Sequence, residues 1–151
     1  MSVVVKIQGI DRLTTKLDKL PSTISINLNK EITDIVVAMD ADVKETINRG
    51  SRSGRVYKRG KITHTASAAG EPPKTDRGQL VQSFFFDVKK TIEGVVGKLY
   101  NTAAHAKHLE FKPVSDGGRP YMRPLFDRWE DKIIERLTHN IQNSIEDTKR
   151  G

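Results

Sequence analysis

The residues that could do metal-dependent chemistry are His64, Glu71, Lys74 and Asp76, which lie close together in one basic stretch of the chain. Carboxylates beside a lysine or histidine can hold Mg²⁺ and activate water. The surrounding stretch is rich in glycine, serine and proline, whereas catalytic groups need a rigid support. A metal-dependent nuclease is therefore a remote alternative, and we expect the protein not to be an enzyme.

Other catalytic patterns are missing from the sequence. It has no cysteine, no Gly-x-Ser-x-Gly elbow and no phosphate-binding loop of the Walker type. His105 and His108 could share one face of a helix and bind a metal, but no third ligand follows at a useful spacing, and Glu110 points elsewhere on a helical wheel. We expect no catalytic residue, no metal site and no cofactor.

The stretch from residue 49 to 61 is the most basic part of the chain, and no acidic residue follows it before Glu71. Such cations can neutralise DNA phosphates without reading sequence, grip acidic surfaces of neighbouring subunits, or remain in solvent. Tyr57 is the sole aromatic residue there, so base stacking would be weak. The candidate contacts to a subunit partner or a DNA backbone are Arg52, Arg55, Tyr57, Lys58, Arg59 and Lys61.

The chain of 151 residues has the length of one domain, which we place at residues 1–151. Lysine and arginine outnumber aspartate and glutamate by 26 to 19, which gives a net charge of +7 and favours an acidic partner. The start of the chain lacks the pattern of a signal peptide, and no apolar run is long enough to cross a membrane. We expect a protein made in a cytoplasm, with no membrane partner.

Apolar residues at steps of three and four predict two long amphipathic helices. One begins after a cap at Ser22 or Thr23 and ends near Ile47, where Gly50 would adopt a left-handed conformation. The other has Pro124 as its first residue and ends near Asp147. A shorter helix is predicted over residues 10–20.

Short strands are predicted at residues 3–7, 84–88 and 95–100, the last two joined as a hairpin. Short helices are predicted after Asp76, which would form a capping box with Gln79, and over residues 103–111. Residues 50–75 show no pattern and are predicted to form a long, basic, flexible loop or arm. The predicted fold is α+β: two long amphipathic helices and short helices packed on a small, mainly antiparallel sheet.

A string of short motifs runs through the second half of the chain. It consists of Ser-Gly-Arg-Val-Tyr-Lys at 53–58, His-Thr-Ala-Ser-Ala-Ala-Gly-Glu-Pro-Pro at 64–73, Asp-Arg-Gly-Gln-Leu-Val-Gln-Ser at 76–83, Val-Gly at 96–97, Ala106 with Leu-Glu-Phe at 109–111, and Arg-Pro-Tyr-Met-Arg-Pro at 119–124. In this order the motifs resemble a family of head–tail joining, neck or tail-completion (minor tail) proteins of long-tailed phages and prophages. The last motif also reads as a stiff corner before the final helix.

The resemblance implies a structural virion component, assembled in the bacterial host cytoplasm and located in the neck or tail. It implies a ring-forming connector subunit that binds copies of itself and other phage neck or tail proteins, with transient DNA contact. A stand-alone, sequence-nonspecific DNA-binding protein using residues 49–61 is the alternative. The motif residues with an implied structural role are Ser67, Gly70, Glu71, Pro72, Pro73, Asp76, Gly78, Leu80, Leu109, Glu110, Phe111, Arg119, Pro120, Met122, Arg123 and Pro124.

Overall fold

The structure, a computed structural model, describes residues 3–6, 22–92 and 94–150. The helix predicted over residues 10–20 lies outside these ranges. The described elements are β1 (Val3–Lys6), α2 (Ser22–Asn48), β2 (Val56–Arg59), β3 (Ile62–Thr65), α3 (Gln79–Gln82), β4 (Phe84–Thr91), β5 (Gly94–Asn101), α4 (Ala106–Phe111), a 3₁₀ turn η1 (Val114–Asp116) and α5 (Met122–Arg150). The predicted α+β class is confirmed.

The main sheet has the strand order β1-β5-β4, and both pairings are antiparallel. β4 and β5 form the predicted hairpin, in which Phe84 pairs with Asn101 and Thr91 with Gly94. β1 pairs along the other side of β5, with Val3 opposite Asn101. β1, near the start of the chain, is therefore paired with β5, which comes much later in the sequence.

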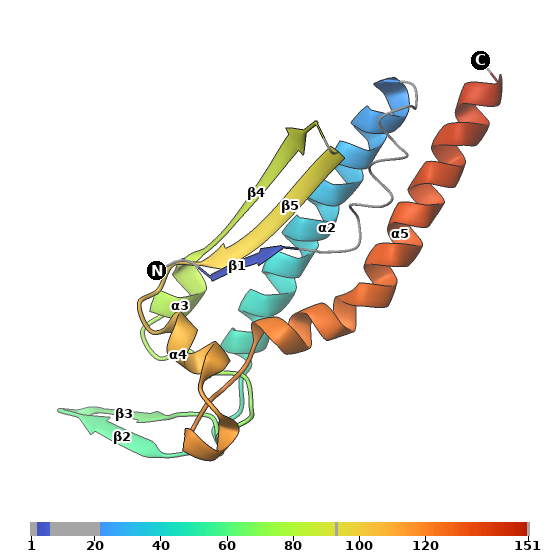
Figure 1. Cartoon of the computed structure of the whole chain (residues 1–151). Helices are drawn as coiled ribbons and strands as arrows, with labels where there is room; N and C mark the ends of the chain where they lie inside the picture. Colours follow the sequence, from blue (N-terminus) through green and yellow to red (C-terminus); the bar gives the residue numbers. More distant parts are fainter. Residues whose placement is uncertain (1–2, 7–21, 93, 151) are drawn as a thin grey trace.

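The body has three layers in the order sheet, α2, α5, as Figure 1 shows. Helix α2 lies close to the sheet because Gly97 on β5 has no side chain. A Cβ atom there would lie 2.7 Å from Val36 Cγ2 and 2.9 Å from Ile32 Cγ2. The apolar stripe predicted for this helix is buried, comprising Ile24, Leu28, Ile32, Ile35, Val36, Met39, Val43 and Ile47.

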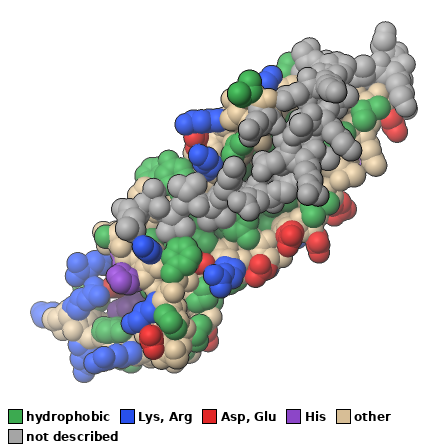
Figure 2. Space-filling view, in the orientation of Figure 1, with side chains coloured by type: hydrophobic (Ala, Val, Ile, Leu, Met, Phe, Trp, Pro, Cys, Tyr) green, Lys and Arg blue, Asp and Glu red, His purple; other side chains and the backbone are tan. Residues whose placement is uncertain are grey.

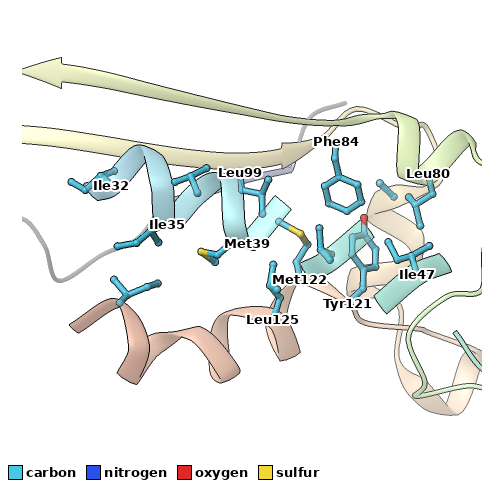
Figure 3. Packing of buried hydrophobic residues seen from close by; sticks show 14 of the residues in the cluster. Ile32, Ile35, Met39, Ile47, Leu80, Phe84, Leu99, Tyr121, Met122 and Leu125 are labelled. Carbon is cyan, nitrogen blue, oxygen red and sulfur yellow. The ribbon is translucent and has the colours of Figure 1, made fainter. Parts of the chain in front are cut away.

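The core continues from α2 into the end of the body near α3 and α4. Figure 3 shows Met39 of α2 lying between Leu99 of the sheet and Leu125 of α5. Phe84 and Tyr121 meet edge to face, with ring centroids 5.8 Å apart. Burying such apolar side chains removes them from water at a gain of roughly 25 cal/mol per Å².

Polar contacts also join α2 to α5. Asp42 accepts a 2.6 Å hydrogen bond from Trp129 Nε1 and a 3.1 Å hydrogen bond from the Arg128 guanidinium. Partial burial raises the pKa of the Asp42 carboxyl, but the hydrogen bonds from Trp129 and Arg128 and the Arg128 charge together outweigh burial, so the pKa lies below its ordinary value. Further along the helices, Arg136 donates to Glu31 at 2.6 Å.

The end of α2 differs from the prediction. Gly50 is not among the glycines with positive φ in the described residues, so it is not a left-handed cap. Its role is close packing, because a Cβ atom there would lie 3.1 Å from the Pro73 carbonyl oxygen. The carbonyls at the end of the helix accept instead from the Thr75 amide, 3.1 Å from the Ile47 oxygen, and from the Lys74 ammonium, which bonds the Asn48 oxygen.

Residues 50–75 were predicted to lack regular structure, and here the structure differs. β2 and β3 form an antiparallel hairpin, with Val56 opposite Thr65 and Arg59 opposite Ile62. Gly60, with a φ of 59°, takes the first central position of the two-residue turn, where a type II′ turn places glycine. The basic character of the stretch concealed two short runs that contain β-branched and aromatic residues, Val56-Tyr57 and Ile62-Thr63. No described helix is both long and apolar enough to cross a membrane.

Candidate functional site

The β2–β3 hairpin projects from one end of the body (Figure 1) and carries most of the predicted contact residues. Both strands lie at the surface, and Val56 and Ile62 are 53% and 70% exposed. Figure 2 shows lysine and arginine side chains gathered at this end of the molecule. The predicted contacts are all exposed and lie on or next to the hairpin: Arg52, Arg55, Tyr57, Lys58, Arg59 and Lys61.

The two faces of the hairpin have different surroundings. Directly paired residues share a face and successive residues alternate, so Tyr57, Arg59 and His64 lie on one face and Val56 and Lys58 on the other. The first face borders a cleft toward the body, because those three residues line it. The Arg55 guanidinium lies 5.5 Å from the Tyr57 ring centroid and can make a cation–π contact. The second face points away from the cleft.

The base of the hairpin is closed by Glu71, the glutamate of the Glu-Pro-Pro motif. Its Oε2 atom accepts hydrogen bonds from the hydroxyls of Ser51 and Ser53 and, at 3.0 Å, from the Ala68 amide. These bonds from Ser51, Ser53 and Ala68 hold the pKa of the Glu71 carboxyl below its ordinary value. We call these four residues the basal clasp. It joins the segment before the hairpin to the segment after it.

A second contact at the base explains two other motif residues. The Gly54 amide donates to the Ala66 carbonyl at 2.8 Å. A Cβ atom on Gly54 would lie only 2.3 Å from the Ser67 carbonyl oxygen, so only glycine allows this approach. Ala66 and Ser67 are buried beneath it. The segment after β3 also reaches the other end of the motif string, because the Gly70 amide donates to the Gly118 carbonyl at 2.8 Å.

The cleft between the hairpin and the body has a volume of about 440 Å³, and its lining includes four lysine and arginine side chains but only one carboxylate. Asp76 lies in it and bonds Arg59 at 2.5 Å, with His64 Nδ1 3.7 Å away. Asp76 therefore does not cap α3 as predicted. Gly78, with a φ of 76°, is the residue before that helix, and no side chain caps it. The titratable side chains that line the cleft are Tyr57, Arg59, His64, Lys74, Asp76, Arg77, His105 and Arg119.

The residues of the nuclease alternative are engaged in structural contacts. Glu71 holds the basal clasp, Lys74 bonds the end of α2, and Asp76 bonds Arg59. Among residues 3–6, 22–92 and 94–150, no three histidine, aspartate or glutamate side chains are grouped so that they could hold a metal ion. His105 precedes α4 and His108 lies within it.

Glu110 has a role that the helical wheel did not predict. It is buried, and its carboxylate accepts hydrogen bonds from the backbone amides of Tyr121, Met122 and Arg123 at 2.8, 2.9 and 2.9 Å. These amides lie at the start of α5, where N–H groups have no partner within the helix, and Pro124 has no N–H to satisfy. The helix therefore begins at Met122, before the predicted Pro124.

The Glu110 contact joins two motifs that are apart in the sequence. A carboxylate also suits the positive end of the helix dipole. The Arg119 amide donates to the Leu109 carbonyl at 2.8 Å, so the two segments run together before the cap. Burial, with the Glu110 charge nearby, raises the pKa of Tyr121, which keeps its phenol neutral. The sequence contained both parts of this contact, Glu110 in the motif at 109–111 and a predicted helix start in the motif at 119–124. No sequence pattern indicated that the two would meet.

The remaining motif residues occupy three environments in the described structure. Those in the core are Leu80 and Met122, with Pro73 buried beside the end of α2. Those at intermediate depth are Pro72, Gly78, Leu109, Pro120 and Pro124. Those at the surface are Gly70, Asp76, Phe111 and Arg123, of which Phe111 is 57% exposed.

The arrangement has the features of a binding surface on a rigid body: a projecting cationic hairpin, a clasped base and a basic cleft beneath it. Function is commonly carried by such segments when a scaffold positions them. Comparison of the chain with protein-family models, with curated proteins and with solved structures finds no match.

Proposed function

We propose that this protein is a non-enzymatic structural subunit of a long-tailed phage virion, which forms a ring in the neck or tail with copies of itself. The observation that carries the proposal is the projecting β2–β3 hairpin, a cationic and partly apolar surface held away from the core. Apolar side chains exposed beside cations are typical of surfaces that other proteins cover.

The motif resemblance supports the same function. The motifs make contact with one another: Glu71 bonds Ser53, and Glu110 bonds Met122. A set of residues that builds the base of a hairpin and the start of a long helix suits a subunit that has to present the hairpin in a fixed position. In the virion, the partners would be other copies of the chain and other neck or tail proteins.

The proposal is tested by the mass and shape of the purified protein. We expect light scattering at low salt to report a multiple of the 17.0 kDa chain, and electron microscopy to show closed rings. We also expect hydrogen exchange of residues 56–65 to slow when the ring forms, because partner contacts protect exposed strands. A chain that remains monomeric both alone and with isolated phage heads or tails would contradict the proposal.

Sequence-nonspecific DNA binding is the second candidate, and the exposed cations of the hairpin favour it. Neutralised phosphates release counterions, so affinity for a duplex would fall steeply as salt rises. The two functions separate in one experiment, in which Lys58→Ala and Lys61→Ala are combined. Loss of duplex binding with intact assembly favours the DNA-binding protein, and loss of assembly favours the virion subunit.

A further inference from the structure

The outer surface of α5 carries the opposite charge from the hairpin. Asp127, Glu130, Asp131 and Glu135 are all exposed, and their spacing of three and four places them on one side of the helix. Ile134 lies among them and is 59% exposed. We call these five residues the acidic face. Figure 2 shows acidic side chains along the body and basic ones gathered at the hairpin end.

We propose that the β2–β3 hairpin of one copy docks on the acidic face of α5 of a second copy. This inference rests on the proposed function, because it names the contact through which the subunits would assemble. It also goes beyond that function, because it assigns the receiving surface.

Complementary charge is the first reason for this pairing. The outward face of the hairpin and its turn present Lys58 and Lys61, neither of which lies toward the cleft residues Tyr57 and His64. Opposite potentials on two surfaces favour their encounter and fix their orientation. In contrast, Arg59 is engaged by Asp76 within its own chain at 2.5 Å.

Apolar complementarity is the second reason, and it favours a protein partner over a nucleic acid. A DNA backbone needs charge and reach from the protein, whereas the outward face of the hairpin also exposes Val56 beside Lys58. The acidic face offers Ile134 to Val56. Beside it, Glu135 borders a hollow of about 340 Å³, which is also lined by the Trp129 ring, His139 and the cations Lys132 and Arg136.

The geometry of this contact suits a ring. The hairpin and the acidic face are different surfaces, so the contact between two copies is heterologous, and repeating it gives a closed ring or an open filament. Each copy would donate one hairpin and receive one. The two copies need not be related by a two-fold axis, which distinguishes this contact from that of a symmetric dimer.

The test is a charge exchange. We expect Lys58→Glu with Lys61→Glu to weaken self-association more than about tenfold, because like charges placed together at an interface repel each other. We expect Asp131→Lys with Glu135→Lys to do the same, and the four changes together to restore association. The matched control is Lys90→Glu with Lys107→Glu, which changes the net charge equally at exposed positions on β4 and α4 and should leave association unchanged.

A cross-linking experiment gives a second measurement, which does not depend on a stable oligomer. The chain has no cysteine, so Val56→Cys on the outward face of the hairpin and Ile134→Cys on the acidic face, in two separately tagged chains, provide one defined pair. A short bismaleimide should join the two chains when they are mixed, and not when Ile134→Cys is replaced by Lys90→Cys.

The outcomes separate this inference from the function on which it rests. Rings that form normally in the charge-reversed variants, without a cross-link, would overturn the docking contact and leave the virion function standing. A chain that neither associates nor cross-links, but binds duplex DNA through Lys58 and Lys61, would overturn both. Rescue by the combined charge exchange is the result that supports the contact, because only surfaces that touch can compensate each other.

Discussion

The body and the hairpin of this protein are held by different kinds of contact. In the body, two long helices and a sheet bury one contiguous apolar core, whose members range in the sequence from Leu28 to Leu137. In the hairpin region, both strands are largely exposed, and the segment is fixed at its base by the clasp around Glu71 and by the close approach of Gly54 to Ser67. Exposed residues of the hairpin can therefore be substituted without affecting the core. A surface that contacts partners requires such tolerance.

The largest expected effect compares one apolar truncation in each region. Leu125→Ala removes a fully buried side chain and leaves a cavity, so the free energy of unfolding should fall by about 3 kcal/mol. Ile62→Ala, at a position 70% exposed, should change it by less than about 0.5 kcal/mol. Urea unfolding of both variants measures the difference. Equal losses would show that the hairpin belongs to the core.

The next effect concerns Glu110, which joins the Leu-Glu-Phe motif at 109–111 to the Arg-Pro-Tyr-Met-Arg-Pro motif at 119–124. Glu110→Ala removes the acceptor for three amides at a buried helix start, and we expect a loss of about 2 kcal/mol. Glu110→Gln retains one oxygen acceptor and should lose less. Thermal unfolding followed by circular dichroism gives both values. If the alanine variant is as stable as the wild type, the cap does not stabilise α5.

A smaller effect is expected for Asp42, the carboxylate that links α2 to α5. Because its pKa lies below the ordinary value of 3.8, its ionised form stabilises the fold. This contribution is present above the ordinary pKa and is lost as pH falls through the lowered one. Asp42→Asn should therefore cost about 0.5–1 kcal/mol near neutral pH.

The pH dependence of that difference is the critical measurement. Urea unfolding near neutral pH and at about pH 2 should show the gap between wild type and Asp42→Asn closing in acid. Asp34→Asn, at an exposed position on the same helix α2, is the control and should show little gap at either pH. A gap that persists in acid would mean that the side-chain shape, and not the charge, matters.

A change in the basal clasp should have the smallest effect on global stability and a clear effect on local amide exchange. Glu71→Gln should leave the unfolding midpoint unchanged while amide exchange of residues 56–66 becomes severalfold faster, because the clasp is local and exposed. The pKa of Glu71 lies below its ordinary value of 4.5, so the clasp should hold at neutral pH and open as pH falls through that lowered pKa.

The Ala68 amide reports this opening directly, because it donates to Glu71. Its nuclear magnetic resonance shift should follow the titration in the wild type and be insensitive to acid in Glu71→Gln. Glu146→Gln, at an exposed position of α5 outside the acidic face, is the control and should leave that titration unchanged. A slower exchange of the hairpin in Glu71→Gln would be the opposite of what the clasp predicts.

Local periodicity accounts for what the sequence predicted well. The two long helices and the β4–β5 hairpin follow from side-chain spacing within each segment, and such spacing depends only on the geometry of one element. The same reasoning failed for residues 50–75, because the two strands on either side of Gly60 are short and exposed and show no alternation of buried and exposed residues. The same reasoning also predicted that Asp76 caps α3, whereas Asp76 forms an ion pair with Arg59 of the hairpin.

By itself, the sequence determined the α+β class, the apolar stripes of α2 and α5, and an excess of positive charge concentrated between residues 49 and 61. Only the tertiary structure decided that Glu110 caps α5, that Glu71 closes the base of the hairpin, and that acidic and basic surfaces lie on different elements. The physical reason is distance along the chain. A repeat of three or four residues is set by one helix, whereas a carboxylate finds its donors only after packing brings separate segments together.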